Sequence, residues 1–256
     1  MRRVFVAIQN LMFWPLFFAA SIVYISIATV FIVVIALASS KRFTLRRLRR
    51  AITWYGRTVI ACGWPFVRVK YRDLNPGEKS PPYIFVCNHR STSDPFLLAC
   101  LPFEAIQVAK GWAMKLPILG PVARLAGYLT FQEISVDHFF EEGKRLLEEK
   151  VCIISFPEGT RSGSRKMGQF TSPVFRLALQ KKVDIVPLAI AGSENIPLKG
   201  RLVLHPGLIR VEKLPAVKWE EYRNMDVFKL KNHVRNILDT HLKSIESDKN
   251  IERNES

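Results

Sequence analysis

The chain has 256 residues, 48% of them hydrophobic, and carries a formal net charge of +16 at pH 7. This length suits one domain of ordinary size with appendages, and the apolar content is sufficient for a packed core. The four cysteines show no Cys-x-x-Cys spacing, and the five histidines show no ligand spacing. The composition therefore argues against a zinc site or a disulfide framework, and the excess of cations requires an anionic partner.

The first 40 residues differ in composition from the rest of the chain. After Met1-Arg2-Arg3, residues 4–40 contain no formal charge. This run is much longer than the apolar core of a signal peptide, about 7–15 residues, so we expect residues 1–40 to form a membrane segment. Basic residues cluster directly after it, and the chain has no recognised nucleic-acid motif. An anionic bilayer surface, which attracts basic residues by about 1 kcal/mol each, is therefore a better partner than nucleic acid.

Two arrangements of this segment are compatible with its length. One helix over residues 4–40 extends about 55 Å, against a hydrocarbon core of about 30 Å. Pro15 can break such a helix, which leaves either an interfacial piece followed by a single span over 15–38, or a shallow hairpin. Residues 41–64 predict a basic amphipathic helix in the headgroup layer. Its arginines predict that the rest of the chain lies on the cytoplasmic side of the membrane, the inner membrane if the protein is bacterial.

From residue 65 onward, short apolar runs alternate with helical patterns. Strands are expected at 66–71, 82–87, 106–109, 128–131, 151–155, 183–190 and 202–211, and helices at 95–100, 112–115, 120–126, 136–150 and 172–181. This alternation indicates a single α/β domain over residues 65–225, with a mostly parallel sheet flanked by helices. Residues 226–256 are expected to form a C-terminal helix that ends in a frayed, solvated tail from Glu246.

A histidine and an aspartate lie on the turn that follows the strand expected at 82–87. The turn reads Asn-His-Arg-Ser-Thr-Ser-Asp-Pro over residues 88–95. One helical turn can bring the carboxylate of Asp94 against the imidazole of His89, which fixes the tautomer and leaves Nε2 free as a general base. In the alternative interpretation, Asp94 only caps a helix and His89 is an ordinary turn residue. No Gly-x-Ser-x-Gly nucleophile lies nearby, so we assign the hydroxyl to be deprotonated to a substrate.

A second polar loop, Phe-Pro-Glu-Gly-Thr-Arg-Ser over residues 156–162, follows the strand expected at 151–155. Together the two loops resemble the glycerolipid acyltransferase family, the 1-acyl-sn-glycerol-3-phosphate acyltransferases and their relatives. The family's His-(four residues)-Asp motif is matched by His89 and Asp94, and its Pro-Glu-Gly-Thr-Arg motif by residues 157–161. The later Val-Pro-apolar segment is matched within 185–189. The resemblance covers roughly residues 60–215, with the motifs in the expected order.

The resemblance implies transfer of an acyl group from acyl-CoA or acyl carrier protein to the free hydroxyl of a lysolipid. The acceptor implied first is 1-acylglycerol-3-phosphate, which gives phosphatidic acid. His89 would take the proton of the acceptor hydroxyl, and Asp94 would orient the ring and stabilise the imidazolium. The chemistry needs no metal, no cofactor and no acyl-enzyme, because both substrates can meet at one site.

The resemblance also implies that Glu158, Gly159, Thr160 and Arg161 bind the acceptor headgroup. The guanidinium of Arg161 suits a phosphate, and Gly159 lets backbone N–H groups approach an anion. Glu158 cannot bind phosphate itself, so we expect it to hold Arg161 or a neighbouring backbone group.

The chain departs from the family's pattern in two places. An arginine that contacts the acceptor phosphate is missing from residues 127–133, and Phe-Lys-Gly is replaced by Phe-Thr-Ser-Pro over residues 170–173. Lys110, Lys115 and Arg124 lie between the motifs and are candidates to replace the missing cations. The departures leave two alternatives open: a different acceptor, such as a lysophospholipid or lyso-aminolipid, or a non-catalytic protein that binds anionic membranes.

Overall fold

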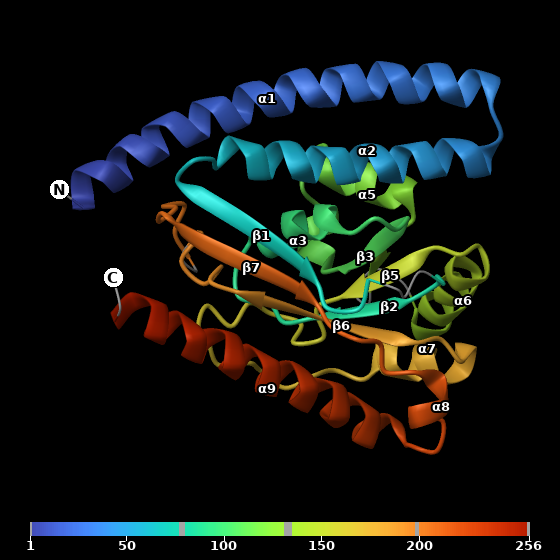
Figure 1. Ribbon diagram of the computed structural model, residues 1–256. Coiled ribbons are helices and arrows are strands. Elements are labelled where there is room, and N and C mark those ends of the chain that lie inside the picture. The colour runs from blue at the N-terminus through green and yellow to red at the C-terminus, as the bar shows by residue number, and fades with distance from the viewer. Residues whose placement is uncertain (1, 77–79, 131–134, 198–199, 255–256) are drawn as a thin grey trace.

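The computed structural model describes residues 2–76, 80–130, 135–197 and 200–254 (Figure 1). Helix α1 (Arg2–Ala38) continues through Pro15 as one element, so the break predicted there is not found. The rings of Phe13, Trp14 and Phe17, close to the proline in sequence, pack against one another with centroids 5.1–5.8 Å apart. The chain reverses only after Ala38, and α2 (Lys41–Cys62) returns along α1.

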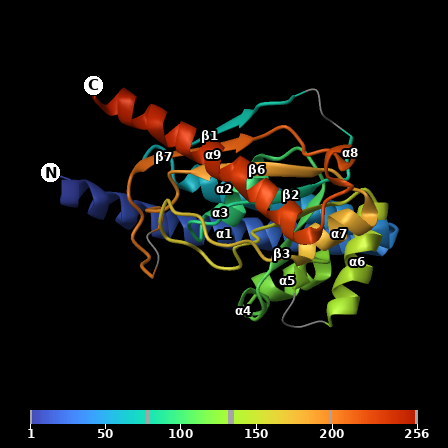
Figure 2. The same cartoon turned by 90° about the horizontal axis from the view of Figure 1, so that it is seen from below.

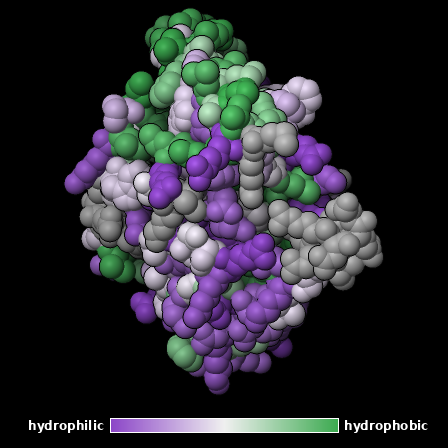
Figure 3. Space-filling model, turned by 90° about the vertical axis from the view of Figure 1, so that its left-hand side faces the viewer, coloured by the Kyte–Doolittle hydropathy of each residue, from purple (hydrophilic) through white to green (hydrophobic). Residues whose placement is uncertain are grey.

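Helix α1 presents an apolar surface to its surroundings. It is long and apolar enough to cross a membrane, judged by length and composition. Figure 3 shows hydrophobic side chains gathered at the top of the molecule, over α1, with a hydrophilic surface below. The exposed large apolar side chains of α1 include Ile22, Val23, Ile27, Val30, Phe31, Val34 and Leu37.

A seven-stranded sheet forms the centre of the domain, in the order β1-β7-β6-β2-β5-β3-β4. All neighbouring strands are parallel except β6 and β7, so β1 and β7 run opposite to the others. The predicted α/β domain with a mostly parallel sheet is thereby confirmed. The strands are β1 (Val67–Asp73), β2 (Ile84–Cys87), β3 (Ala105–Ala109), β4 (Leu129–Thr130), β5 (Cys152–Ser155), β6 (Ile185–Ala191) and β7 (Gly207–Lys213).

Two strand predictions differ from the structure. The strand expected at 202–211 begins only at Gly207, after a segment without regular secondary structure. The strand expected at 128–131 is limited to Leu129 and Thr130, and residue 131 lies outside the described residues.

Helices cover both faces of the sheet (Figures 1 and 2). One face carries α2, α3 and α5, with α1 outside them, and the other carries α6, α7 and α9. Strand side chains alternate between the two layers: in β2, Ile84 and Val86 join the α9 side, whereas Phe85 and Cys87 join the α2 side. The helices after α2 are α3 (Asp94–Leu97), a 3-10 turn (Leu98–Cys100), α4 (Gly111–Met114), α5 (Leu119–Ala126), α6 (Val136–Glu148), α7 (Pro173–Lys181), α8 (Trp219–Tyr222) and α9 (Val227–Asn254).

Helix α2 is fastened to the domain through the carboxylate of Glu104. Both terminal nitrogens of Arg42 donate to this carboxylate, at 2.5 and 2.9 Å, and Nη1 of Arg49 donates to it at 2.8 Å. The side chain of Arg49 is only 1% exposed. These two arginines therefore face the domain, in contrast to the headgroup position expected for α2. Burial raises the pKa of Glu104, but the hydrogen bonds from Arg42 and Arg49 outweigh it, so the pKa is lowered.

Replacing Glu104 with glutamine is expected to lower the free energy of unfolding by about 3 kcal/mol, because the buried guanidinium of Arg49 loses its charge partner. The lowered pKa means that this carboxylate contributes stability above its unfolded pKa, which is lost as the pH falls through its folded value. The difference between wild type and Glu104→Gln should therefore shrink below about pH 4.

Thermal unfolding in detergent at several pH values checks both statements. The control is Glu148→Gln, which removes an exposed pair with Lys181 and should leave the melting temperature nearly unchanged. Equal melting temperatures of the two variants would contradict the role given to Glu104.

Candidate active site

The histidine and aspartate of the first motif meet where β2 ends. Nδ1 of His89 and Oδ2 of Asp94 are 2.9 Å apart. The carboxylate side chain is fully buried, whereas that of His89 is 16% exposed. The aspartate engages one nitrogen of the ring, and the other nitrogen, Nε2, has no hydrogen-bond partner among the described residues. This is the arrangement of a general base oriented by a carboxylate.

The loop itself supplies the other donors to this carboxylate. Oδ2 of Asp94 accepts the backbone N–H groups of Arg90, at 2.6 Å, and of Ser91, at 2.8 Å. Asp94 is the first residue of α3, and Ser93 at the N-cap makes no side-chain capping bond. The carboxylate turns back toward the loop, so the interpretation of Asp94 as a simple helix cap does not describe this geometry.

Glu158 joins the second loop to the first. Its Oε1 accepts the backbone N–H of His89 at 2.8 Å, and its Oε2 accepts the backbone N–H of Gly168 at 2.7 Å. Burial raises the pKa of Glu158, and the two N–H donors offset this only in part. Of the two roles expected for Glu158, these hydrogen bonds correspond to holding neighbouring backbone groups.

The remaining residues of the second motif follow β5 in a turn at the surface. Gly159 has a φ of +65°, a conformation that L side chains rarely adopt, and a Cβ added there would meet no atom within 4 Å. Thr160 is exposed and Arg161 is half-buried. The backbone N–H of Ser162 donates to the carbonyl of His89 at 2.9 Å, so the second loop bonds to both the N–H and the carbonyl of His89.

The sheet brings a third segment to the same edge. Strand β5 lies between β2 and β3, and the three strands are parallel. Ile154 pairs with both Phe85 and Gln107, so the register, continued past the strand ends, puts Lys110 level with Asn88, two strands away. Two strand spacings amount to about 10 Å, within the combined reach of a lysine side chain and a small ligand. Lys110 is exposed and immediately precedes α4.

Comparisons with known proteins point to one family. The family model described as "Acyltransferase" matches residues 68–191. A "1-acyl-sn-glycerol-3-phosphate acyltransferase" of Limnanthes alba is 25% identical over 220 residues, 76% of this chain and 77% of that protein. The human "1-acyl-sn-glycerol-3-phosphate acyltransferase alpha" is 31% identical over 189 residues, 71% of this chain and 66% of that protein.

A solved structure shares the fold. The crystal structure of "the 1-acyl-sn-glycerophosphate (LPA) acyltransferase, PlsC" from Thermotoga maritima superposes with a TM-score of 0.78. The two chains are 21% identical in sequence, and the superposition covers 96% of the present chain and 98% of the Thermotoga maritima chain. The chain belongs to the acyltransferase family. The predicted resemblance is thereby confirmed.

Several residues that hold the acyltransferase site were missed in the sequence. Asn88 exchanges two hydrogen bonds with the backbone of Ile190, at 2.8 and 2.9 Å, and so fastens the loop to β6. Arg90 is buried and donates to Glu246 at 2.6 Å. We expected a frayed tail from Glu246 onward. Helix α9 instead continues to Asn254, so the prediction of a frayed tail from Glu246 is wrong. The apolar spacing of Leu230, Val234, Leu238, Leu242 and Ile245 was the only signal that the helix stays packed up to this point.

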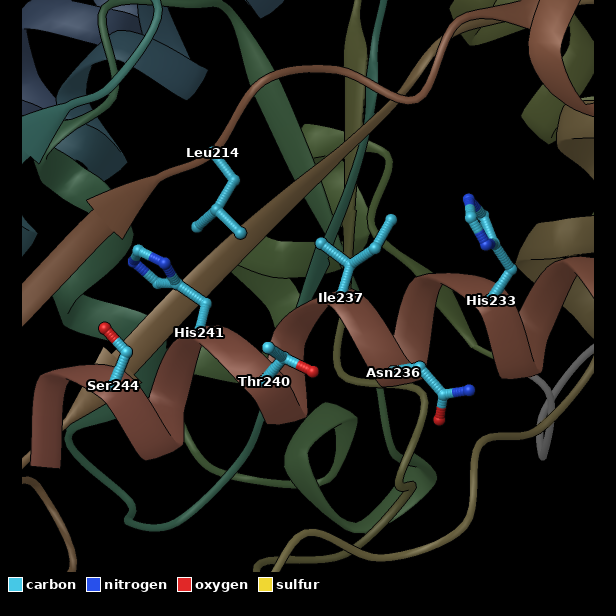
Figure 4. A pocket seen from close by; sticks show the side chains of 7 residues that line it. All are labelled: Leu214, His233, Asn236, Ile237, Thr240, His241 and Ser244. Atoms are coloured by element: carbon cyan, nitrogen blue, oxygen red, sulfur yellow. The ribbon is translucent and has the colours of Figure 1, made fainter. Parts of the chain in front are cut away.

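A groove of about 600 Å³ lies elsewhere on the acyltransferase, along α9 (Figure 4). His241 in this groove pairs with Glu212 of β7 at 2.8 Å. No residue of the two motifs is among its described lining residues, which are Leu214, His233, Asn236, Ile237, Thr240, His241 and Ser244. The groove therefore lies apart from the dyad.

Replacing Glu158 with glutamine is expected to loosen the two loops of the acyltransferase. The amide can accept only through its oxygen, so one of the two N–H groups, of His89 or of Gly168, would face an NH₂ group. We expect the free energy of unfolding to fall by about 1–3 kcal/mol. Chemical denaturation measures this, with the exposed Glu141→Gln as control. Unchanged stability in Glu158→Gln would show that its carboxylate does not hold the loops.

Proposed function

We propose that the protein transfers a fatty acyl group from the thioester of acyl-CoA or acyl carrier protein to the free hydroxyl of 1-acylglycerol-3-phosphate, giving phosphatidic acid. The observation that carries the proposal is the 2.9 Å contact between His89 Nδ1 and the buried carboxylate of Asp94, with Nε2 turned away from it. Two similar proteins, those of Limnanthes alba and human, are named as 1-acyl-sn-glycerol-3-phosphate acyltransferases, which supports this acceptor. The family membership supports acyl transfer in general.

In this mechanism, Nε2 of His89 accepts the proton of the acceptor hydroxyl while its oxygen attacks the thioester carbonyl. The tetrahedral adduct collapses, the carbon–sulfur bond breaks, and the imidazolium returns the proton to the departing thiolate. Asp94 stabilises the imidazolium between the two steps. No residue of the enzyme is acylated, since the oxygen of the acceptor is the nucleophile.

The acceptor phosphate would lie between Arg161 and Lys110. Arg161 follows β5 and Lys110 follows β3, at the same carboxyl edge of the sheet as His89. Ligands of open α/β sheets bind at this edge. Of the candidate cations between the motifs, Lys115 follows α4 and Arg124 lies within α5, so neither is placed at a strand end. Lys110 is therefore our candidate to replace the missing motif arginine.

We further propose that the enzyme works at the cytoplasmic surface of a membrane, attached through α1. The exposed apolar surface of α1 supports this attachment. Arg47 and Arg50 line an apolar groove of about 490 Å³ between α1 and α2, where they can meet anionic headgroups. The acceptor is itself a membrane lipid, so attachment brings the site to its substrate.

A different lysolipid is the second candidate acceptor. It is favoured by one observation, the absence of arginine from residues 127–133. A lysophospholipid with a larger headgroup or a lyso-aminolipid would use the same dyad.

Replacing His89 with alanine is expected to reduce acyl transfer by about 10²–10⁴-fold, because the acceptor hydroxyl loses its general base. The measurement is thiol release from long-chain acyl-CoA, and from acyl carrier protein, with a panel of lysolipids in detergent. His138→Ala, which removes an exposed histidine of α6, is the matched control and should retain full activity.

Equal rates for His89→Ala and wild type would contradict the general-base assignment. Activity confined to another lysolipid would keep the mechanism and change the acceptor. A wild-type protein that binds anionic vesicles and is silent with every donor and acceptor would favour the non-catalytic alternative.

Replacing Lys110 with alanine is expected to raise KM for lysophosphatidic acid by about tenfold, the effect of one charge-assisted hydrogen bond to phosphate. KM for acyl-CoA should not change, and Lys115→Ala is the control. The rate with monoacylglycerol, which lacks the phosphate, should be the same in wild type and variant. A loss of activity that is equal for both acceptors would show that Lys110 does not bind the phosphate.

A further inference from the structure

The C-terminal helix α9 lies outside the region 68–191 that matches the acyltransferase family model. It nevertheless contacts both loops of the active site from the face of the sheet opposite α1 and α2 (Figure 2). Two side chains of α9, Arg235 and Glu246, make these contacts. They are eleven residues apart, which is close to three full helical turns, so they lie on the same side of the helix.

Glu246 makes the first contact, through Arg90. The guanidinium of Arg90 is 2% exposed and donates to Oε1 of Glu246 at 2.6 Å. It also donates to Oε2 of Glu194 at 3.4 Å and to the carbonyl of Arg165 at 3.0 Å. The backbone N–H of the same Arg90 donates to Oδ2 of Asp94 at 2.6 Å. The position of Arg90 therefore links a carboxylate of α9 to the carboxylate of the dyad.

Arg235 makes the second contact, through Met167 and Gly168, which lie between the second loop and α7. Its Nε donates to the carbonyl of Gly168 at 2.9 Å, and its Nη2 donates to the carbonyl of Met167 at 3.0 Å. The N–H of Gly168 donates to Glu158, whose other oxygen accepts the N–H of His89. Both contacts thus reach the backbone of two adjacent residues, His89 and Arg90.

The apolar side of α9 gives these contacts a fixed base. Leu230, Val234 and Leu238 are fully buried against the sheet, and Leu242 and Ile245 are 3% and 4% exposed. Interiors packed this closely transmit displacement instead of absorbing it. A shift at Glu246 would therefore move Arg90, and with it a donor to the dyad.

We propose that α9 is a positioning element of the active site, in which Glu246 and Arg235 hold the loop backbone that places His89 and Asp94. Neither residue touches the reacting atoms. The inference rests on the proposed acyl transfer for its kinetic test, but not for its structural one.

The kinetic test compares Glu246→Gln with Asp239→Asn. Both variants remove one carboxylate from α9, but Asp239 pairs only with Lys243 on the helix surface among the described residues. We expect kcat of Glu246→Gln to fall by about tenfold or more with KM unchanged, since small displacements of reacting groups are costly. The melting temperature should fall as well, because the buried guanidinium of Arg90 loses a charge partner. Arg235→Gln should behave likewise against Lys243→Gln. The double variant Arg90→Gln/Glu246→Gln should be no slower than Arg90→Gln alone, because Glu246 acts through Arg90.

The structural test is hydrogen exchange of the backbone amides over residues 88–94, which does not depend on activity. These amides should exchange faster in Glu246→Gln than in Asp239→Asn and wild type. Identical kcat and identical exchange in Glu246→Gln and Asp239→Asn would overturn the proposal. A lower melting temperature of Glu246→Gln without faster exchange over residues 88–94 would also overturn it, since Glu246 would then have only a general structural role. An inactive wild type would refute the proposed function alone, and exchange would then decide the role of α9. If Arg90→Gln does not fold, Glu246→Gln and Arg235→Gln, each with its control, still decide the role of α9.

Discussion

The buried carboxylate of Asp94 sets the geometry on which the site depends. A carboxylate removed from water needs hydrogen-bond donors to offset the cost of its burial. Here one oxygen collects the imidazole N–H of His89 and the N–H groups of Arg90 and Ser91. The loop between the two dyad residues must therefore wrap around the carboxylate. That wrapping fixes which ring nitrogen faces the aspartate and which is left for chemistry.

The sheet explains why residues from distant parts of the chain meet at this carboxylate. Strands β2, β5 and β3 are adjacent and parallel, so the segments that follow them share one edge. The first loop supplies the paired histidine and aspartate, the second a glutamate with a glycine turn, and the third a lysine. The opposite layer then holds this edge: Glu246 and Arg235 reach it from α9. The end of each of these strands contributes at least one residue to the site, and side chains of α9 bond to two of the segments that follow them.

Patterns local in sequence predicted most of the fold and the dyad. Apolar runs placed the strands that flank the site, and the helix expected at 136–150 is found at Val136–Glu148. What failed depends on contacts between distant residues. Helix α1 continues through Pro15, and residues on both sides of the proline contact distant parts of the chain: Asn10 bonds to the backbone of Leu204, and Tyr24 donates to the carbonyl of Ala51. Arg49 faces Glu104 and not lipid, and no local signal distinguishes its two possible environments. Glu246 accepts a hydrogen bond from Arg90, which lies 156 residues earlier in the chain.

The central claim is that the dyad activates a hydroxyl of the acceptor directly. The most direct measurement is to mix the protein with acyl-CoA and lysophosphatidic acid, and to follow the lipids and the intact protein together by mass spectrometry. If the acceptor hydroxyl attacks the thioester directly, we expect phosphatidic acid and free coenzyme A in equal amounts, an unchanged protein mass, and no thiol release without acceptor. An acylated protein that transfers its acyl group onward, or thiol release without a lipid product, would contradict it.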